Sequence, residues 1–250
     1  MDLQLNDKVA LVTGSSRGIG KAIAFTLFEE GCKIILNGKN QILLKKTSQS
    51  FSNSTKFIVA DITKPTQCKK LIKKIIHLYG RLDILVCNVG DGKSVQPGKE
   101  TSEEWKKMFE INLQSATNII EASKNELSLT KGSIICISSI AGLNVIGAPI
   151  PYSVMKSALN TYVKCAARPL GEKNIRINAI APGNIMFEGS VWEKKETENP
   201  SLVKKILKDE VSLHRFGKPK EIAELAAFLS SPRSSFITGS VYVIDGGQIR

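Results

Sequence analysis

Two side chains in the stretch YSVMK, Tyr152 and Lys156, have the types and the spacing for acid–base chemistry. Residues four apart share one face of a helix, so the Lys156 ammonium is expected beside the Tyr152 phenol. An unperturbed tyrosine has a pKa near ~10, and a neighbouring ammonium lowers it by stabilising the phenolate. Tyr152 can then act as a general acid toward a carbonyl oxygen or as a general base toward an alcohol. Ser139 ends an apolar run 13 residues earlier, where its hydroxyl can bond the same oxygen.

A glycine-rich stretch near the start of the chain, TGSSRGIG, is suited to binding a phosphate. It follows the apolar run VALV and precedes a helical pattern. The amino-terminal end of a helix offers free N–H groups and a positive dipole end, and glycine lets a ligand approach the backbone. The spacing of Gly14, Gly18 and Gly20 differs from both the common dinucleotide fingerprint and the P-loop. Taken alone, the loop is equally consistent with a tight turn without ligand, and Tyr152 and Lys156 with a surface pair.

The elements that must position these residues alternate along the chain. Apolar, β-branched runs predict strands at 8–13, 33–37, 56–60, 83–87, 132–138, 175–180 and 240–244. Helical patterns fill the gaps at roughly 18–30, 40–50, 64–79, 101–127, 151–172 and 219–230. Continuously apolar strands joined by helices predict an α/β fold, a doubly wound parallel sheet of about seven strands with helices on both faces. No repeat or linker divides the chain, so one domain over residues 1–250 is expected.

Composition narrows the classes of function. The five cysteines are dispersed without a CxxC pair, which favours free thiols in a reducing cytoplasm over disulfides or a metal site. No apolar run is long enough for a membrane span, and no metal-binding motif is present. The net charge of +12 comes largely from paired lysines on expected solvated helix faces. Nucleic-acid binding has no recognition motif behind it, whereas attraction of an anionic substrate, cofactor or carrier is a second interpretation of the charge.

Together with CNVG at 87–90 and the serine pair at 138–139, these motifs resemble the classical short-chain dehydrogenase/reductase family. The resemblance covers essentially the whole chain and includes GRLDILV, IRINAIAPG and the final stretch beginning RFGKPKEIAELAAF. It implies a Rossmann-type fold, hydride transfer between a nicotinamide cofactor and a ketone or secondary alcohol, and a homotetramer or dimer in the cytoplasm.

The resemblance also implies a role for each site residue. Ser139, Tyr152 and Lys156 are implied to be catalytic, Lys156 also holding the nicotinamide ribose, and Asn112 in FEINL to hold a proton-relay water. Asp61 and Ile62 are implied to meet the adenine, Asn88 and Gly90 to lie beside the ribose, and Ile185 to contact the nicotinamide through its backbone. The whole cofactor-binding set is Gly14, Ser16, Arg17, Gly18, Ile19, Gly20, Lys39, Asp61, Ile62, Asn88, Gly90, Tyr152, Lys156 and Ile185.

Two cations and a missing carboxylate favour NADP(H) over NAD(H). Sites that prefer NAD carry an acidic residue after the second strand, which accepts the ribose hydroxyls. Asn37 is expected at that place here, and no Asp or Glu occurs between Glu30 and Asp61. Lys39 follows, and Arg17 lies inside the glycine loop, so both can meet a 2′-phosphate. Solvated charges are the alternative.

Several stretches depart from the family pattern. The charged loop DGKS (91–94) should lie near the substrate entrance, where Lys93 is either a contact for an anionic substrate or a solvated side chain. Phe187 stands where the family often has a threonine that touches the nicotinamide. The irregular segment 186–200 is expected to be a mobile lid, with Trp192 either turned toward substrate or packed at the hinge. Pro169 is expected to cause a bend or an early irregularity in its helix.

The expected function is reduction of a ketone or oxidation of a secondary alcohol with NADP(H). The first substrate class considered is a 3-oxoacyl thioester on an acidic carrier protein, and a sugar or polyol derivative is the alternative. A non-catalytic NADP-sensing or scaffold protein is an alternative from another class. We favour an enzyme, because a sensor has no need of Tyr152 and Lys156 together.

Overall fold

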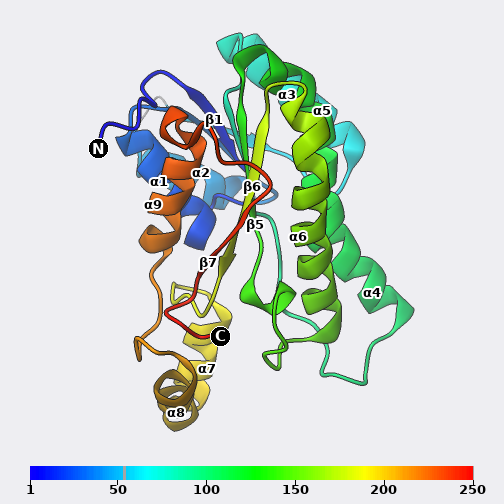
Figure 1. Ribbon diagram of the computed structural model, residues 1–250, viewed down its shortest axis with the longest axis vertical. Helices are drawn as coiled ribbons and strands as arrows, with labels where there is room; N and C mark the ends of the chain where they lie inside the picture. Colours follow the sequence, from blue (N-terminus) through cyan, green and yellow to red (C-terminus); the bar gives the residue numbers. More distant parts are fainter. Residues whose placement is uncertain (53–54, 250) are drawn as a thin grey trace.

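A seven-stranded, all-parallel sheet forms the centre of the protein (Figure 1). The computed structural model describes residues 1–52 and 55–249. The strand order is β3-β2-β1-β4-β5-β6-β7, so the chain reverses its direction of winding between β1 and β4. This switch point is where open α/β sheets bind ligands. The strands are β1 (Val9–Val12), β2 (Lys33–Gly38), β3 (Lys56–Val59), β4 (Ile84–Cys87), β5 (Ser133–Ile137), β6 (Arg176–Pro182) and β7 (Val241–Ile244).

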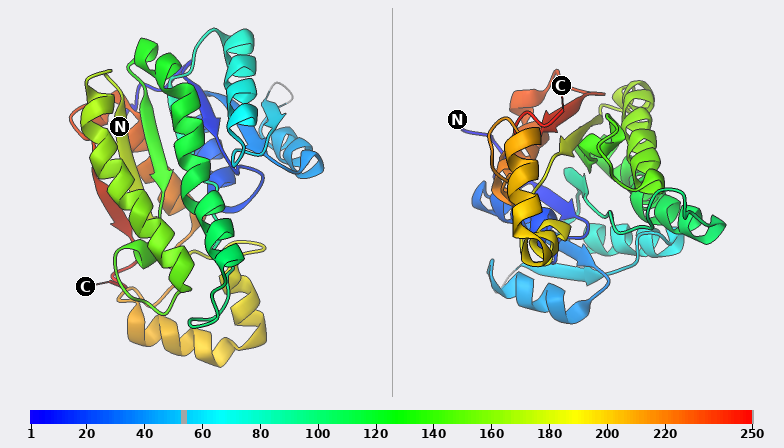
Figure 2. Two further views of the ribbon diagram at one scale, coloured as in Figure 1. Left: turned by 90° about the vertical axis from the view of Figure 1, so that its right-hand side faces the viewer. Right: turned by 90° about the horizontal axis from the view of Figure 1, so that it is seen from below.

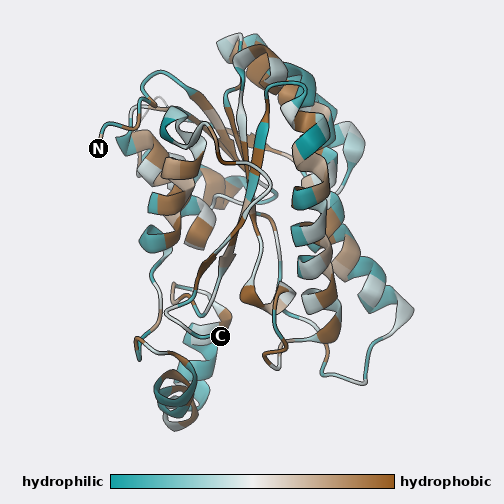
Figure 3. Ribbon diagram, viewed as in Figure 1, coloured by the Kyte–Doolittle hydropathy of each residue, from teal (hydrophilic) through white to brown (hydrophobic). Residues whose placement is uncertain are grey.

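Helices pack on both faces of the sheet (Figure 2). One face is covered by α1, α2 and α9, and the other by α3, α5 and α6. Figure 3 shows their apolar residues facing the sheet and their polar residues facing outward, and in α3 the lysines lie on the exposed side. The helices are α1 (Gly18–Glu29), α2 (Gln41–Gln49), α3 (Pro65–Tyr79), α4 (Ser102–Phe109), α5 (Ser115–Thr130), α6 (Ile150–Gly171), α7 (Val191–Glu198), α8 (Pro200–Glu210) and α9 (Pro219–Ser230). A π-helical turn (Glu110–Gln114) and 3₁₀ turns (Ile140–Gly142, Pro232–Ser234) complete the elements.

The predicted doubly wound sheet is confirmed, and all seven strands end within two residues of their predicted bounds. The helical pattern predicted over 101–127 is confirmed, but a π turn within it separates α4 from α5. The early irregularity predicted at Pro169 is absent, since α6 continues to Gly171, and the alternative of a bend stays a prediction. Pro169 lies in the last turn, and because proline has no N–H, α6 lacks only the hydrogen bond to the Cys165 carbonyl there.

The segment 186–200 was predicted to be irregular, and this prediction is wrong. It contains α7, and α8 begins at its end. Ser190 caps α7 by accepting a hydrogen bond from the Glu193 N–H at 3.0 Å, and Asn199 caps α8 through the Leu202 N–H at 3.0 Å. These two capping residues are the sequence signals that the prediction overlooked. Both helices lie at the carboxyl ends of the strands (Figure 1).

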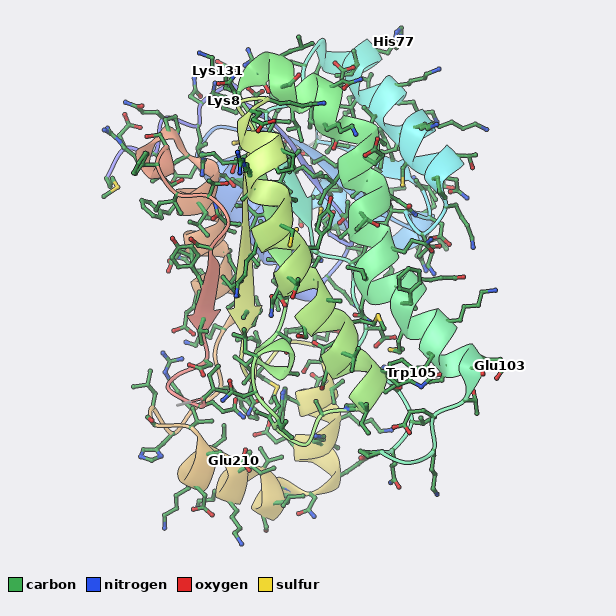
Figure 4. All side chains as sticks on the ribbon, turned by 45° about the vertical axis from the view of Figure 1, so that its right-hand side comes forward. Lys8, His77, Glu103, Trp105, Lys131 and Glu210 are labelled. Atoms are coloured by element: carbon green, nitrogen blue, oxygen red, sulfur yellow. The ribbon has the colours of Figure 1, made fainter. Side chains whose placement is uncertain are left out.

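The two ends of the sheet are distinguished by labelled side chains in Figure 4. Lys8 and Lys131, which precede β1 and β5, lie at the amino ends of the strands, whereas Glu210 of α8 and Trp105 of α4 lie toward the opposite end. His77 projects from the carboxyl-terminal half of α3, far from Glu210 (Figure 4).

The five cysteines are free, and all but Cys165 are buried. Within residues 1–52 and 55–249, no helix is both long and apolar enough to cross a membrane.

Candidate active site

The glycine-rich loop connects β1 to α1 at the switch point of the sheet. Gly14 and Gly18 have positive φ angles of +62° and +57°, which side chains with a β-carbon rarely adopt. Gly20 packs so closely on the carbonyl of Gly14 that a β-carbon would lie 2.6 Å from that oxygen. The side chain of Arg17, the residue before α1, does not cap the helix, and the first turn of α1 contains no acidic residue. The first N–H groups of α1 are therefore suited to a phosphate.

Part of the segment after β6 lies against this loop. The ring of Phe187 packs on Gly18, where an added β-carbon would lie 2.6 Å from the ring edge. The guanidinium of Arg17 lies beside Gly189, with Nη1 2.7 Å from the place of an added β-carbon. Arg17 is exposed, and its guanidinium lies against the segment before α7. Lys39 instead lies near Asp61, whose pKa it helps to lower. The structure thus brings Lys39 to the segment after β3 and Arg17 to the segment before α7.

The end of β2 corrects one sequence prediction. Asn37 was expected at the place of the ribose-binding acid, but its side chain is fully buried and donates to the carbonyls of Ile58 at 3.1 Å and Ala60 at 3.3 Å. The last strand residue, half-buried Gly38, has its side-chain position on the opposite side of the strand. Lys39 follows it directly and is exposed. The residue at the place where NAD-preferring sites carry an acidic side chain is therefore Gly38.

The other predicted cofactor residues lie along the same edge of the sheet. Partial burial raises the pKa of Asp61, but hydrogen bonds from Thr63 and the positive charge of the nearby Lys39 lower it further, so that the pKa lies below its usual value. Ile62 is buried, so only its backbone is available to a ligand. The Asn88 amide donates to the carbonyls of Thr13 and Gly14, both at 3.0 Å, and so it supports the glycine loop from below.

Two further predicted cofactor residues contact neighbouring segments through their backbones. The Ser16 carbonyl accepts a hydrogen bond from the Thr47 hydroxyl at 2.8 Å, which ties the loop to α2. Ile185 is buried and forms an isolated parallel bridge with Gly217. The bridge is made by the Asn184 carbonyl and the Met186 N–H, which leaves the Ile185 N–H and carbonyl on the other side of the segment.

Tyr152 and Ser139 come together as predicted. Ser139 follows β5 and caps a short 3₁₀ turn, its hydroxyl accepting from the Ala141 N–H at 3.1 Å. Tyr152 lies in the first turn of α6, and its phenol forms a side-chain hydrogen bond with Ser139. The neighbouring Ser138 hydroxyl instead donates to the Lys156 carbonyl at 3.3 Å. Ser138 thus contacts the backbone of α6, whereas Ser139 contacts the Tyr152 phenol.

The charge around the phenol differs from the prediction. Burial raises the pKa of Tyr152, the Ser139 hydrogen bond lowers it, and the carboxylate of Asp91 raises it further, so the pKa lies above its ordinary value. The predicted lowering by Lys156 is wrong for this arrangement, because the Lys156 Nζ atom lies 5.8 Å from the Tyr152 ring centre and is itself desolvated. Burial lowers the pKa of Lys156 to about 8. Its Nζ donates to the Ile137 carbonyl at 2.9 Å.

Asn112 lies in the π-helical turn between α4 and α5 and is completely buried. Its Oδ1 accepts from the Asp91 N–H at 3.0 Å, and its Nδ2 donates to the Asp91 carbonyl at 3.1 Å. A π turn widens a helix locally and is frequent at functional sites. Here it directs Asn112 to the loop after β4, and Gly90 of that loop has no room for a β-carbon, which would lie 2.9 Å from the Lys156 Nζ and 3.0 Å from the Asn112 Oδ1.

Trp192 belongs to α7 and has neighbours on two sides. Its ring centre lies 5.4 Å from that of Phe216, in the segment before α9, and the Lys195 Nζ lies 4.5 Å above the ring. The two positions considered for Trp192 were toward the substrate and packed at the hinge. The contact with Phe216 corresponds to the packed position.

Sequence reasoning missed two residues of this site. The negative charge of Asp91 raises the pKa of the Tyr152 phenol. In the sequence, the only indication of this role is that a charged residue directly follows Gly90 at the end of a strand. Gly38 was missed by one position, because β2 is buried on both faces and shows no alternation from which its register could be inferred.

Comparison with known proteins agrees with this geometry. The family described as Enoyl-(Acyl carrier protein) reductase matches residues 14–248. The chain is 32% identical to a 3-oxoacyl-[acyl-carrier-protein] reductase of Thermotoga maritima, over 99% of this chain and 100% of that protein.

Two solved structures are similar over nearly their full length. One is L-sorbose reductase from Gluconobacter frateurii complexed with NADPH and L-sorbose, with a TM-score of 0.93, 28% identity, and 100% of this chain and 99% of that chain covered. The other is a 7α-hydroxysteroid dehydrogenase complexed with NADH and 7-oxo glycochenodeoxycholic acid, with a TM-score of 0.90, 28% identity, and 99% and 96% covered.

Proposed function

The chain belongs to the classical short-chain dehydrogenase/reductase family and is an oxidoreductase that acts on a CH–OH/C=O pair, and within this family we propose that it is an NADP(H)-dependent ketone reductase. The observation that carries the proposal is the hydrogen-bonded pair of Ser139 and Tyr152, with Lys156 behind it, at the same end of the sheet as the open amino terminus of α1.

Each side chain has a proposed part in the reduction. The cofactor, when bound, supplies the hydride to the carbonyl carbon. Ser139 orients the carbonyl oxygen by a hydrogen bond, and the Tyr152 hydroxyl donates its proton to that oxygen. With its pKa above its ordinary value, the Tyr152 phenol is protonated at neutral pH and so holds the proton that reduction requires. Lys156, whose Nζ donates to the Ile137 carbonyl, is proposed to bind the nicotinamide ribose.

Asn112 is proposed to hold the loop after β4 in place and, by its likeness to the family, a relay water. The two hydrogen bonds between its side-chain amide and the Asp91 backbone, one accepted and one donated, support the first part. The proposed cofactor site uses the glycine loop, Lys39, Asp61, Asn88, Gly90 and Ile185 at one edge of the sheet.

NADP(H) is proposed over NAD(H) because of the end of β2. Gly38 offers no carboxylate to the ribose hydroxyls, and the exposed Lys39 next to it offers a positive charge to a 2′-phosphate. Arg17 is a second cation within the loop, although its guanidinium lies beside Gly189. Its contribution is separable by experiment. Replacement of Lys39 by Ala should weaken NADPH binding and leave NADH binding almost unchanged, whereas replacement of Arg17 tests whether that side chain also reaches the phosphate.

Two substrate classes have support. A 3-oxoacyl thioester is supported by the full-length likeness to a 3-oxoacyl-[acyl-carrier-protein] reductase and by the +12 charge, which suits an acidic carrier. A sugar or polyol derivative is supported by the likeness to L-sorbose reductase. A screen that follows NADPH absorbance over acyl thioesters, keto-sugars and steroids decides between them. Tight NADPH binding with no turnover on any ketone would instead favour the sensor alternative.

We also propose that the whole chain is one cytoplasmic domain that assembles as a homotetramer or dimer. The α7–α8 arm is proposed to be a lid. Its support is its place at the carboxyl ends of the strands, beside the glycine loop that Phe187 contacts. Trp192 fluorescence, in a protein with Trp105 replaced by Phe, should change when NADPH and substrate bind. An emission and a quencher accessibility that stay constant would make the arm a rigid part of the fold.

A further inference from the structure

The loop after β4 contains a carboxylate that the proposed chemistry does not use. Asp91 is half-buried, and both its N–H and its carbonyl are held by the amide of Asn112. One carboxylate oxygen, Oδ1, accepts the N–H of Lys93 at 2.9 Å. The other, Oδ2, has no hydrogen-bond partner in residues 1–52 and 55–249. Asp91 is thus a fixed residue with one free acceptor atom.

The neighbours of Asp91 place it beside the reacting groups. Gly90 lies against the Lys156 Nζ, and Gly92 faces the Tyr152 ring, whose nearest atoms would lie 3.8 Å from an added β-carbon. Asp91 lies between these two glycines. Its electrostatic effect on the phenol, which raises the pKa of Tyr152, agrees with this position.

A second polar group lies in the same loop. The hydroxyl of Ser94 is buried and has no hydrogen-bond partner within the described part of the chain. A hydrocarbon chain placed against the free oxygen of Asp91 would displace water from that oxygen without offering it a donor, which costs free energy. A substrate that carries its own donors removes that penalty.

We propose that Asp91 is a specificity-determining residue, whose free carboxylate oxygen accepts a hydrogen bond from a hydroxyl on the carbon next to the reacting ketone. The site then selects hydroxy ketones of the keto-sugar type over 3-oxoacyl thioesters, whose C3 carbonyl is flanked by carbon groups that donate no hydrogen bond. This inference rests on the proposed ketone reduction and specifies its substrate class.

A matched pair of ketones tests the proposal. The compounds 1-hydroxy-2-butanone and 3-pentanone differ only in a hydroxyl or a methyl group on the carbon next to the carbonyl. The ratio of their kcat/KM values should favour the hydroxy ketone in the wild type, and should fall roughly ten- to a hundredfold in Asp91→Ala. A change in the acidity of Tyr152 affects both ketones alike, so it cancels in this ratio. Asp91→Asn keeps the size of the side chain and should give a smaller loss.

Two controls distinguish the possible failures. Glu103→Gln removes an exposed carboxylate on α4 (Figure 4) and should leave the ratio unchanged. NADPH binding to the Asp91 variants reports whether their site is intact. Equal ratios in the wild type and Asp91→Ala, or a wild type that prefers a short 3-oxoacyl thioester, would overturn the inference while ketone reduction stands. A wild type that binds NADPH but reduces none of these ketones, nor any keto-sugar, would overturn the proposed function and the inference with it.

Discussion

The substitution Gly38→Asp tests the cofactor preference at the position that the structure identifies. Gly38 does not have a positive φ angle, and an added β-carbon would lie no closer than 3.7 Å to its nearest neighbour, Leu44. That distance is an ordinary van der Waals contact, so an aspartate fits without strain. Its carboxylate would lie beside Lys39, where the 2′-phosphate of NADPH is proposed to bind.

The magnitude follows from Coulomb's law. A carboxylate about 5 Å from a doubly charged phosphate is repelled by roughly 2–3 kcal/mol for an effective dielectric constant of about 40 to 80. The Kd of NADPH should therefore rise roughly 30- to 150-fold. NADH lacks this phosphate and gains an acceptor for its ribose hydroxyls, so its Kd should fall by about tenfold, as expected for one or two hydrogen bonds of about 1 kcal/mol.

Fluorescence titration of NADPH and NADH measures both changes. The matched control is Gly38→Asn, which has almost the same shape without the charge and should leave the NADPH affinity within a few fold of the wild type. An aspartate variant that is folded but binds NADPH as well as the wild type does would refute the reasoning. The adenosine ribose would then lie elsewhere, and Lys39 would be a solvated charge.

Three further predictions concern the reacting groups and the stability of the fold. Tyr152→Phe removes the transferable proton but keeps the ring, so NADPH should still bind while turnover falls by orders of magnitude; unchanged turnover would exclude Tyr152 as the acid. Because burial lowers the pKa of Lys156 to about 8, the folded protein binds fewer protons than the unfolded chain between that pH and the ordinary lysine pKa. The unfolding free energy of the wild type relative to Lys156→Met should therefore rise with pH from about 8 to 10, by about 1 kcal/mol per unit, and a constant difference in urea denaturation would contradict this. Asp83 is buried beneath β1 and β4, where it accepts from Arg81 and from the Val9 N–H at 2.9 Å. Asp83→Asn should cost about 1.5–3 kcal/mol of unfolding free energy through its charge-assisted hydrogen bonds, and no measurable loss would show that the ion pair is dispensable.

Local spacing in the sequence was sufficient to predict much of this protein. The alternation of apolar strands and helical patterns predicts the doubly wound sheet, because each pattern reports on the face that its own residues bury. The glycine loop is likewise a local feature, since positive φ angles and close backbone packing at Gly14 and Gly20 depend on neighbours a few residues away. Tyr152 and Lys156 share a helix, so their common direction is determined by their spacing of four.

Contacts between distant segments were decided only by the tertiary structure. Whether Asn37 or Gly38 faces the ligand depends on the register of a strand that is buried on both faces, and a shift of one residue reverses the answer. The direction of Arg17 depends on the segment around Gly189, which follows it by more than 170 residues. The pKa of Tyr152 depends on burial and on Asp91, which the π turn at Asn112 holds in place. Desolvation and through-space charge are set by the packing of separate elements, and no spacing along the chain contains that information.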